Sequence, residues 1–338
     1  MDETTWPFYL SALLTGLAFG YATQRGGFCL TRALSNLFIM GDAAILRAYG
    51  LALLVATVGV HLLLSWGLVE IPIRPFRWVA NLVGGLTFGF GMILSGGCSG
   101  STWYRTGEGA VGAWVVLLGF AMGATTTSVG ALAPLRRTLQ TPSLTLGEAS
   151  PTVYNVVGKL FGAADLSPWT VIVPLGILLG WVLWRGAAEP EHGKWPWPLT
   201  GTVVGVVIAL GWWASNFGRA PTGITFAINT SHALTYPLVG YPTRVTWSMI
   251  LLLGVPVGAF IGAWHSGEFR WKLPPGWSLV KIFAGGLLMG AGGILADGCN
   301  ITQGLTNSAT LAVGSLVAFA SMGLGAYLAL WALYLRRA

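Results

Sequence analysis

Long apolar runs dominate this chain, and short polar or glycine-rich stretches separate them. Runs of about 17 to 25 residues have the length that crosses the hydrocarbon core of a bilayer as a helix. About nine such runs are centred on residues 7–23, 43–67, 77–96, 109–131, 168–185, 199–217, 243–265, 278–296 and 310–334. The pattern predicts an all-α integral membrane protein with about nine transmembrane helices.

Four further stretches are too short to span and too apolar for ordinary loops. They cover residues 27–39, 98–107, 222–233 and 299–308. Irregular backbone at membrane depth is tolerated only where protein or a polar cavity satisfies its hydrogen bonds. We therefore expect four short re-entrant helices that converge on an internal site.

Two of these stretches follow a repeated motif. GGLTFGFGMILSGGCSGS at 84–101 reappears as GGLLMGAGGILADGCNIT at 285–302, with nine of eighteen positions identical and Cys98 opposite Cys299. Both copies run a glycine-dotted apolar helix into a Gly-Cys step, which is how a helix that breaks within the membrane would read. Paired breaks in two halves of a membrane chain indicate a transport site.

The same order of long and short elements occurs once in residues 1–131 and once in residues 199–338. Residues 132–198 lie between them and contain an expected outer loop and one connecting span. Because the spans preceding the second half add up to an odd number, that half must start from the opposite side of the membrane. The chain is thus predicted to be an inverted repeat.

Composition agrees with a membrane protein. The chain is 54% hydrophobic and only 9% charged, which excludes an ordinary soluble domain. Its net charge of +7 does not indicate nucleic-acid binding, because the basic residues are scattered beside apolar spans. With the N-terminus outside, and leaving aside the arginines in the half-helices, we count eight basic residues on the inner face and five on the outer face, which favours an outer N-terminus and a cytoplasmic C-terminus. The acidic start MDETTW does not resemble a signal peptide, so we expect no cleavage.

Cysteines mark three of the four predicted breaks. The chain has only Cys29, Cys98 and Cys299, with no C-x-x-C pair, so neither a disulfide framework nor a zinc site is favoured. No metal or cofactor is predicted. When residues 25–33 are aligned with 219–227, Gly223 stands opposite Cys29 at the fourth break.

Thiols at converging helix breaks suit a soft anion. The N-terminus of a short helix offers unpaired N–H groups and a positive dipole end, and a neutral thiol can donate a hydrogen bond to sulfur. The candidate binding residues are those at the breaks, namely Cys98, Cys29, Cys299, Gly97, Gly298, Ser99 and Asn300. Asp297, Arg25 and Arg105 are possible supporting residues. The alternative is structural: buried cysteines as small apolar residues, Asp297 as a helix cap, and both arginines reaching to the interface.

The break sequences GGFCLTRA at 26–33, SGGCSGS at 95–101 and ADGCNITQG at 296–304 resemble the YeeE/YedE family of bacterial membrane transporters. The resemblance implies uptake of thiosulfate through an hourglass-shaped protein of the inner membrane. It also implies that Cys98, Cys29 and Cys299 hand the ion inward through S–H···S hydrogen bonds, with Cys98 meeting it first. A small TusA-like sulfurtransferase is the implied partner on the cytoplasmic side.

Other functions remain open at this stage. The substrate could be another sulfur anion or a selenium compound, and a channel for a neutral sulfur species would also use paired half-helices. A membrane thiol enzyme would need a resolving cysteine and an electron acceptor site, which the spacing does not offer. A purely structural role would leave all three cysteines replaceable. We expect a transporter and not an enzyme.

Overall fold

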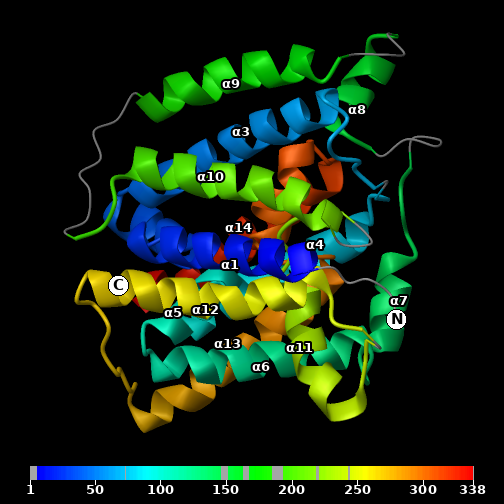
Figure 1. Cartoon of the computed structure of the whole chain (residues 1–338). Coiled ribbons are helices and arrows are strands. Elements are labelled where there is room, and N and C mark those ends of the chain that lie inside the picture. The colour runs from blue at the N-terminus through cyan, green and yellow to red at the C-terminus, as the bar shows by residue number, and fades with distance from the viewer. Residues whose placement is uncertain are drawn as a thin grey trace.

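The computed structural model describes residues 6–72, 74–145, 151–162, 167–184, 193–217, 221–242 and 244–337. Within this part of the chain the regular secondary structure is helical, and β pairing is limited to isolated bridges. The long helices run between two opposite ends of the molecule (Figure 1). We call the end where the first helix begins the N-face, and the opposite end, where the last helix finishes, the C-face.

Nine long helices among the described residues match the nine predicted spans. They are α1 (Trp6–Arg25), α3 (Ala44–Ser65), α4 (Trp78–Ser95), α6 (Val111–Ser128), α9 (Trp169–Trp184), α10 (Trp197–Ala214), α12 (Trp247–His265), α13 (Gly276–Leu295) and α14 (Val313–Leu333). Seven candidate spans, on all of these except α1 and α9, are long and apolar enough to cross a membrane. The prediction of an all-α membrane protein is confirmed, whereas the count of nine spans stays a prediction.

Short helices occur at all four predicted breaks. They are α2 (Leu30–Ser35) with the π-helical turn η1 (Asn36–Met40), α5 (Ser99–Gly107), α11 (Ala227–Val239), and the turns η3 (Thr302–Asn307) and η4 (Ser308–Thr310). α11 starts five residues later than predicted. Left-handed residues produce the breaks: Gly27 follows α1 with φ 58°, and Gly96 ends α4 with φ 71°. Glycine adopts this conformation without a steric penalty.

The region between the halves contains two short helices before α9. These are α7 (Ala133–Gln140) and α8 (Val153–Leu160), which lie at the N-face (Figure 1). Phe76 and Leu144 form an antiparallel bridge that ties this region to the segment before α4. The predicted boundaries of the three regions stay predictions.

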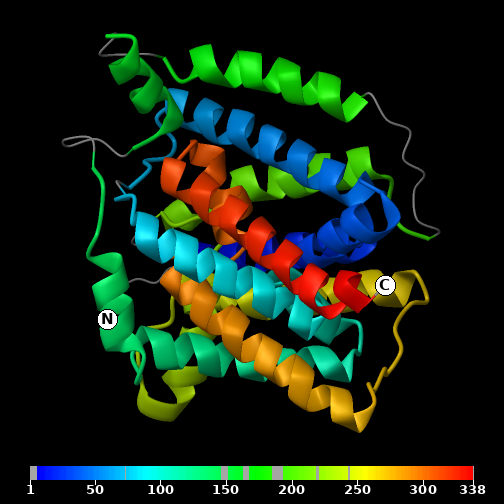
Figure 2. The same cartoon turned by 180° about the vertical axis from the view of Figure 1, so that it is seen from behind.

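Packing between the halves follows a two-fold exchange. α1 packs on α12 and α10 packs on α3, while α4 packs on α14 and α13 packs on α6. The repeated helices α4 and α13 also contact each other, as Figure 2 shows. A Cβ on Gly84 would lie 2.3 Å from the Ala296 nitrogen, and one on Gly285 would lie 2.4 Å from the Ser95 nitrogen. The repeated glycines therefore let α4 and α13 pack backbone against backbone.

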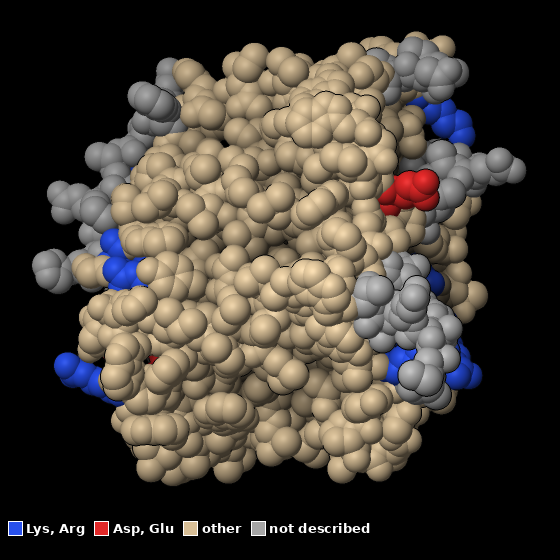
Figure 3. Space-filling view, in the orientation of Figure 1, with Lys and Arg blue, Asp and Glu red and all other residues tan. Residues whose placement is uncertain are grey.

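The surface has the charge distribution of a membrane protein. On the face in view in Figure 3, Lys and Arg side chains gather at the two ends, and an uncharged band lies between them. Large apolar side chains such as Leu253, Ile177 and Trp264 are more than half exposed on the helices. Such an uncharged, apolar band is typical of a surface that contacts lipid.

Candidate functional site

The three cysteines precede helical turns in the interior of the bundle. Cys29 is the residue before α2, and Cys98 caps α5, its Sγ accepting a hydrogen bond from the Ser101 nitrogen at 3.5 Å. Cys299 Sγ lies 3.4 Å from Thr302 Oγ1. All three thiols are buried and free of disulfides. Cys29 and Cys98 are close enough to interact with each other.

A chain of buried polar groups joins three of the breaks. Ser99 Oγ donates to Asn300 Oδ1 at 2.9 Å, and Asn300 Nδ2 donates to the Tyr49 hydroxyl at 3.0 Å. The Tyr49 ring stacks on Phe28, the neighbour of Cys29, with ring centroids 4.0 Å apart. Ser99 and Asn300 occupy equivalent positions of the repeat, so this hydrogen bond links the two halves at the centre.

The fourth break joins the same centre. The Phe226 nitrogen, just before α11, donates to Thr302 Oγ1 at 3.3 Å. Trp103 of α5 donates through Nε1 to Thr230 Oγ1 of α11 at 3.1 Å. The four short elements therefore meet, as expected. Phe226, rather than Gly223, occupies the position before α11 that Cys29 occupies before α2.

The two predicted glycines permit close approach beside the thiols. A Cβ on Gly97 would lie 3.0 Å from Ser101 Oγ, and one on Gly298 would lie 2.8 Å from Thr302 Cγ2. Larger residues at these positions would push the following turn away from its cysteine. Both glycines thus have a packing role, and their role toward a ligand stays a prediction.

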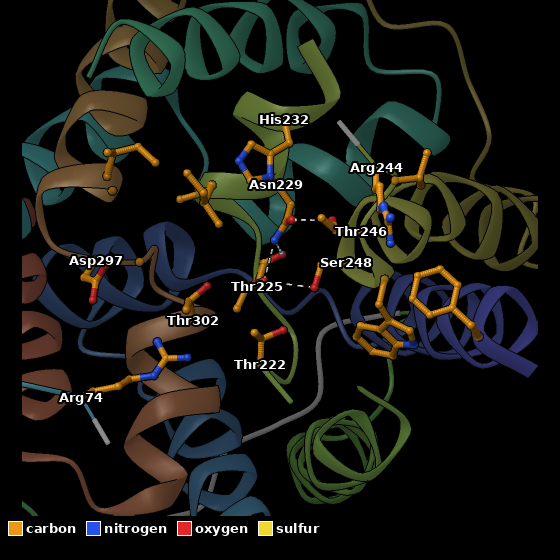
Figure 4. Close-up of a pocket in the computed structure, with 18 of the residues that line it drawn as sticks. Arg74, Thr222, Thr225, Asn229, His232, Arg244, Thr246, Ser248, Asp297 and Thr302 are labelled. Carbon is orange, nitrogen blue, oxygen red and sulfur yellow. Dashed lines mark hydrogen bonds between the residues drawn. The ribbon is translucent and has the colours of Figure 1, made fainter. Parts of the chain in front are cut away.

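A cavity of about 530 Å³ opens at the N-face and reaches residues beside Cys299, such as Thr302 (Figure 4). Its floor includes Gly298 and Thr302, the neighbours of that cysteine. One wall carries a hydrogen-bonded row in which Asn229 Nδ2 donates to Thr225 Oγ1 at 2.6 Å and Thr246 Oγ1 donates to Asn229 Oδ1 at 2.9 Å. We call this space the N-face cavity.

The N-face cavity has a positive balance of charge. Its lining includes Arg74, Arg136 and Arg244 but a single acid, Asp297. The Asp297 carboxylate lies 3.7 Å from Arg77 Nη1 and is half exposed, and its supporting role stays a prediction. Arg136 Nε and His232 Nδ1 of this cavity are buried atoms without a hydrogen-bond partner among the described residues. Such groups can bind an anion.

A second cavity of about 730 Å³ opens at the C-face and is lined by Cys29. Arg105 also lines it and donates to the Gly96 carbonyl at 3.2 Å. Arg25, at the end of α1, lies 3.9 Å from the carboxylate of Glu268, another lining residue. Both predicted arginines thus lie at the C-face end of the bundle. We call this space the C-face cavity.

The three thiols lie in the region between the two cavities, and one of them lines a cavity. Cys29 lines the C-face cavity, and Cys299 is bonded to Thr302 of the N-face cavity. Cys98 is fully buried, interacts with Cys29 and lines neither cavity. Cys299 is likewise fully buried and lines neither cavity, so the expected order in which an ion meets the thiols stays a prediction.

Several residues of the cavities were missed by the sequence reasoning. Glu108 follows α5 and lines the C-face cavity; burial raises its pKa, while nearby Lys194 and Arg105 oppose that shift. Arg136 and His232 of the N-face cavity were also missed. Glu108 at the end of α5 and Arg136 in α7 look like ordinary interface charges in the sequence, and His232 lies within α11 without any motif. Only the folded chain brings them around a cavity.

Apolar helices around two cavities on opposite faces, with broken helices between them, define a membrane transport protein. The chain belongs to the sulphur transport family, whose sequence model matches residues 25–328. It is therefore a multi-pass membrane transporter for a sulfur compound.

Relatives cover nearly the whole chain. The thiosulfate transporter TsuA of Escherichia coli is 29% identical over an alignment of 345 residues that covers 97% of this chain and 95% of the relative. TsuA of Spirochaeta thermophila is 28% identical over an alignment of 340 residues that covers 96% of this chain and 99% of the relative. The probable transporter YedE of Salmonella typhimurium is 35% identical over 117 residues, covering 34% of this chain and 28% of the relative. All are named as transporters, in agreement with the expectation that the chain is not an enzyme.

Proposed function

We propose that this chain imports thiosulfate across a bacterial inner membrane, through a passage that runs from the N-face cavity past Cys299, Cys98 and Cys29 to the C-face cavity. One observation carries the proposal: three buried, free thiols lie between two basic cavities that open on opposite faces. Two relatives that match nearly the whole chain are named thiosulfate transporters. The charge bias along the sequence supports an outer N-face and a cytoplasmic C-face.

Thiols suit the narrow part of such a passage because thiosulfate carries a soft terminal sulfur and hard sulfonate oxygens. In the N-face cavity, the lining arginines provide donors for the oxygens, among them Arg136, whose buried Nε has no hydrogen-bond partner among the described residues. Between the cavities, S–H groups donate to the sulfur. A dianion in a dry constriction would cost several kcal/mol per charge, so these donors and the helix N-termini must replace its water shell.

Movement past the thiols needs no covalent step. The ion passes from Cys299 to Cys98 and on to Cys29 by exchanging one S–H···S hydrogen bond for the next, and each cysteine stays a thiol. On the cytoplasmic side the ion leaves the C-face cavity, where a TusA-like sulfurtransferase is the proposed acceptor.

The test compares thiosulfate uptake by bacterial cells that lack their own uptake system. Cys98→Ser is the informative variant, because serine is a good helix cap and keeps the fold while the soft sulfur is lost. We expect the intact chain to support uptake and Cys98→Ser to reduce it at least about tenfold, a loss of about 1.4 kcal/mol. Ser321→Ala, a small buried substitution on α14 away from both cavities, is the matched control.

The outcomes separate the rival functions. Full uptake by Cys98→Ser at equal expression would reduce the thiol to a packing role and favour a channel without thiol donors. Failure of the intact chain to take up thiosulfate would overturn the proposed substrate, and the same assay with selenium compounds and other sulfur anions would then identify the cargo.

A further inference from the structure

The C-face cavity contains two acids among its many bases. Its basic lining residues are Arg32, Arg105, Lys194, Arg270 and Lys272, and its acids are Glu108 and Glu268. A cavity that only had to attract an anion would be expected to lack acids, because each one opposes binding. The two glutamates therefore call for an explanation beyond attraction of the cargo.

Glu268 occupies the cations that an arriving anion would use. Its Oε2 lies 2.5 Å from Lys194 Nζ and accepts from Gln24 Nε2 at 2.7 Å, and its Oε1 lies 3.9 Å from Arg25 Nη1. The carboxylate thus ties the segment after α12 to the end of α1 and to the segment before α10. An anion that pairs closely with Lys194 therefore competes with this carboxylate for the ammonium group.

Glu108 competes for the same partners. It interacts with Lys194, Arg105 and Lys272, and with the side-chain amide of Gln24 that also holds Glu268. Two carboxylates that share a lysine and an amide favour a proton on one of them. Burial raises the pKa of Glu108, so Glu108 is the carboxyl that takes up the proton.

Glu108 is also connected mechanically to the thiols. It follows directly after α5, a nine-residue helix whose cap is Cys98. Tyr104 of α5 lines the cavity together with Cys29. A change of charge at Glu108 therefore acts at the far end of the helix that holds the central cysteine.

We propose that Glu268 and Glu108 form a proton-linked carboxylate latch: Glu268 neutralises Lys194 and Arg25 when the C-face cavity is empty, and an anion that displaces it is accompanied by a proton on Glu108. The inference rests on the proposed function and couples thiosulfate binding to the uptake of a proton. When the anion is bound, Lys194 and Arg25 pair with it and the proton offsets part of its charge. When the anion leaves, Glu108 releases the proton and Glu268 returns to Lys194.

The test measures thiosulfate binding to purified protein by calorimetry from about pH 8 to about pH 5, the range in which histidines also titrate. Thiosulfate stays a dianion throughout. We expect affinity to rise as pH falls, by at most about tenfold per pH unit for one linked proton. Proton uptake on binding is read from the dependence of the heat on the ionisation enthalpy of the buffer.

Substitutions test which residue takes up the proton that accompanies thiosulfate binding. Glu108→Gln imitates the protonated carboxyl, so it should bind as tightly at high pH as the wild type does at low pH, with no proton uptake. Glu268→Gln removes the competitor of the anion and should bind several-fold more tightly at high pH. Glu70→Gln, an exposed acid remote from this cavity, and His265→Gln, a histidine at the C-face end of α12, are controls that should behave as wild type.

The possible outcomes distinguish a failure of the latch from a failure of the proposed function. Thiosulfate binding without proton uptake, or proton uptake that survives in Glu108→Gln, overturns the latch and leaves the proposed function standing. Loss of the pH dependence in His265→Gln would assign the proton to that histidine and also overturn the latch. Absence of both binding and cellular uptake of thiosulfate by the wild type overturns the proposed function and the latch with it.

Discussion

Ser99 and Asn300 hold the two repeats together at their centre, and each is buried completely. Ser99→Ala removes the donor and leaves the Asn300 oxygen without its partner, which costs about 1 to 3 kcal/mol for a buried group. We expect a lower unfolding temperature in detergent than for Ser65→Ala, whose exposed hydroxyl bonds only within α3. Equal shifts for the two variants would show that the central hydrogen bond contributes nothing.

Asp297 opposes the arginines of the N-face cavity. The half-exposed carboxylate pairs weakly with Arg77, and exposed pairs are worth about 0 to 1 kcal/mol. Asp297→Asn should therefore strengthen capture of an anion, lowering the KM of thiosulfate uptake about two- to threefold at low ionic strength. The gain should fade in high salt because the effect is screened. An increase of KM would instead make Asp297 part of the binding machinery.

At the scale of elements, the close contact of α4 and α13 depends on glycine. A Cβ on Gly84 would collide with the backbone of Ala296 at 2.3 Å, so Gly84→Ala forces the two helices apart and should cost about 1 to 3 kcal/mol, as overpacking does. Gly323→Ala on α14 is the matched control, since no atom lies within 4 Å of its Cβ position. That variant should be neutral or more stable. Thermal unfolding in detergent compares them, and similar losses would mean that the contact is loose.

The elements were predictable because a membrane leaves few choices for the backbone. Hydrophobic length alone located the long helices, and the repeated Gly-Cys step located the breaks before α5 and η3. The fourth break does carry a left-handed glycine, Gly223 with φ 61°, but α11 starts only at Ala227, later than the sequence predicted. The π-helical turns at Asn36 and Thr302 were not anticipated, since their hydrogen-bond register depends on tertiary packing.

At the scale of the whole molecule, the sequence identified the thiols but not the cavities around them. Cys98 and Cys299 could be recognised because they occupy equivalent positions of a sequence repeat. Glu108, Glu268 and His232 belong to segments without such a repeat, and only the fold places them around the cavities. A repeat thus identifies candidate site residues in the sequence, while the cavities that lead to them are found only in the three-dimensional structure.

Transport toward the cytoplasm requires that the two cavities face opposite compartments in a fixed orientation. Basic side chains such as Arg270, Lys272 and Lys281 cluster near the C-face, and cytoplasmic segments retain such residues during insertion. A fluorescent protein that matures only in the cytoplasm should therefore be bright when fused after Ala338, and a periplasmic phosphatase fused there should be inactive. Reversing the charge bias, by replacing these three residues with Gln and adding lysines beside Arg136, should weaken that preference. An active phosphatase on the unaltered chain would place the C-face cavity outside, so that thiosulfate would enter past Cys29 and the latch would act at the uptake step.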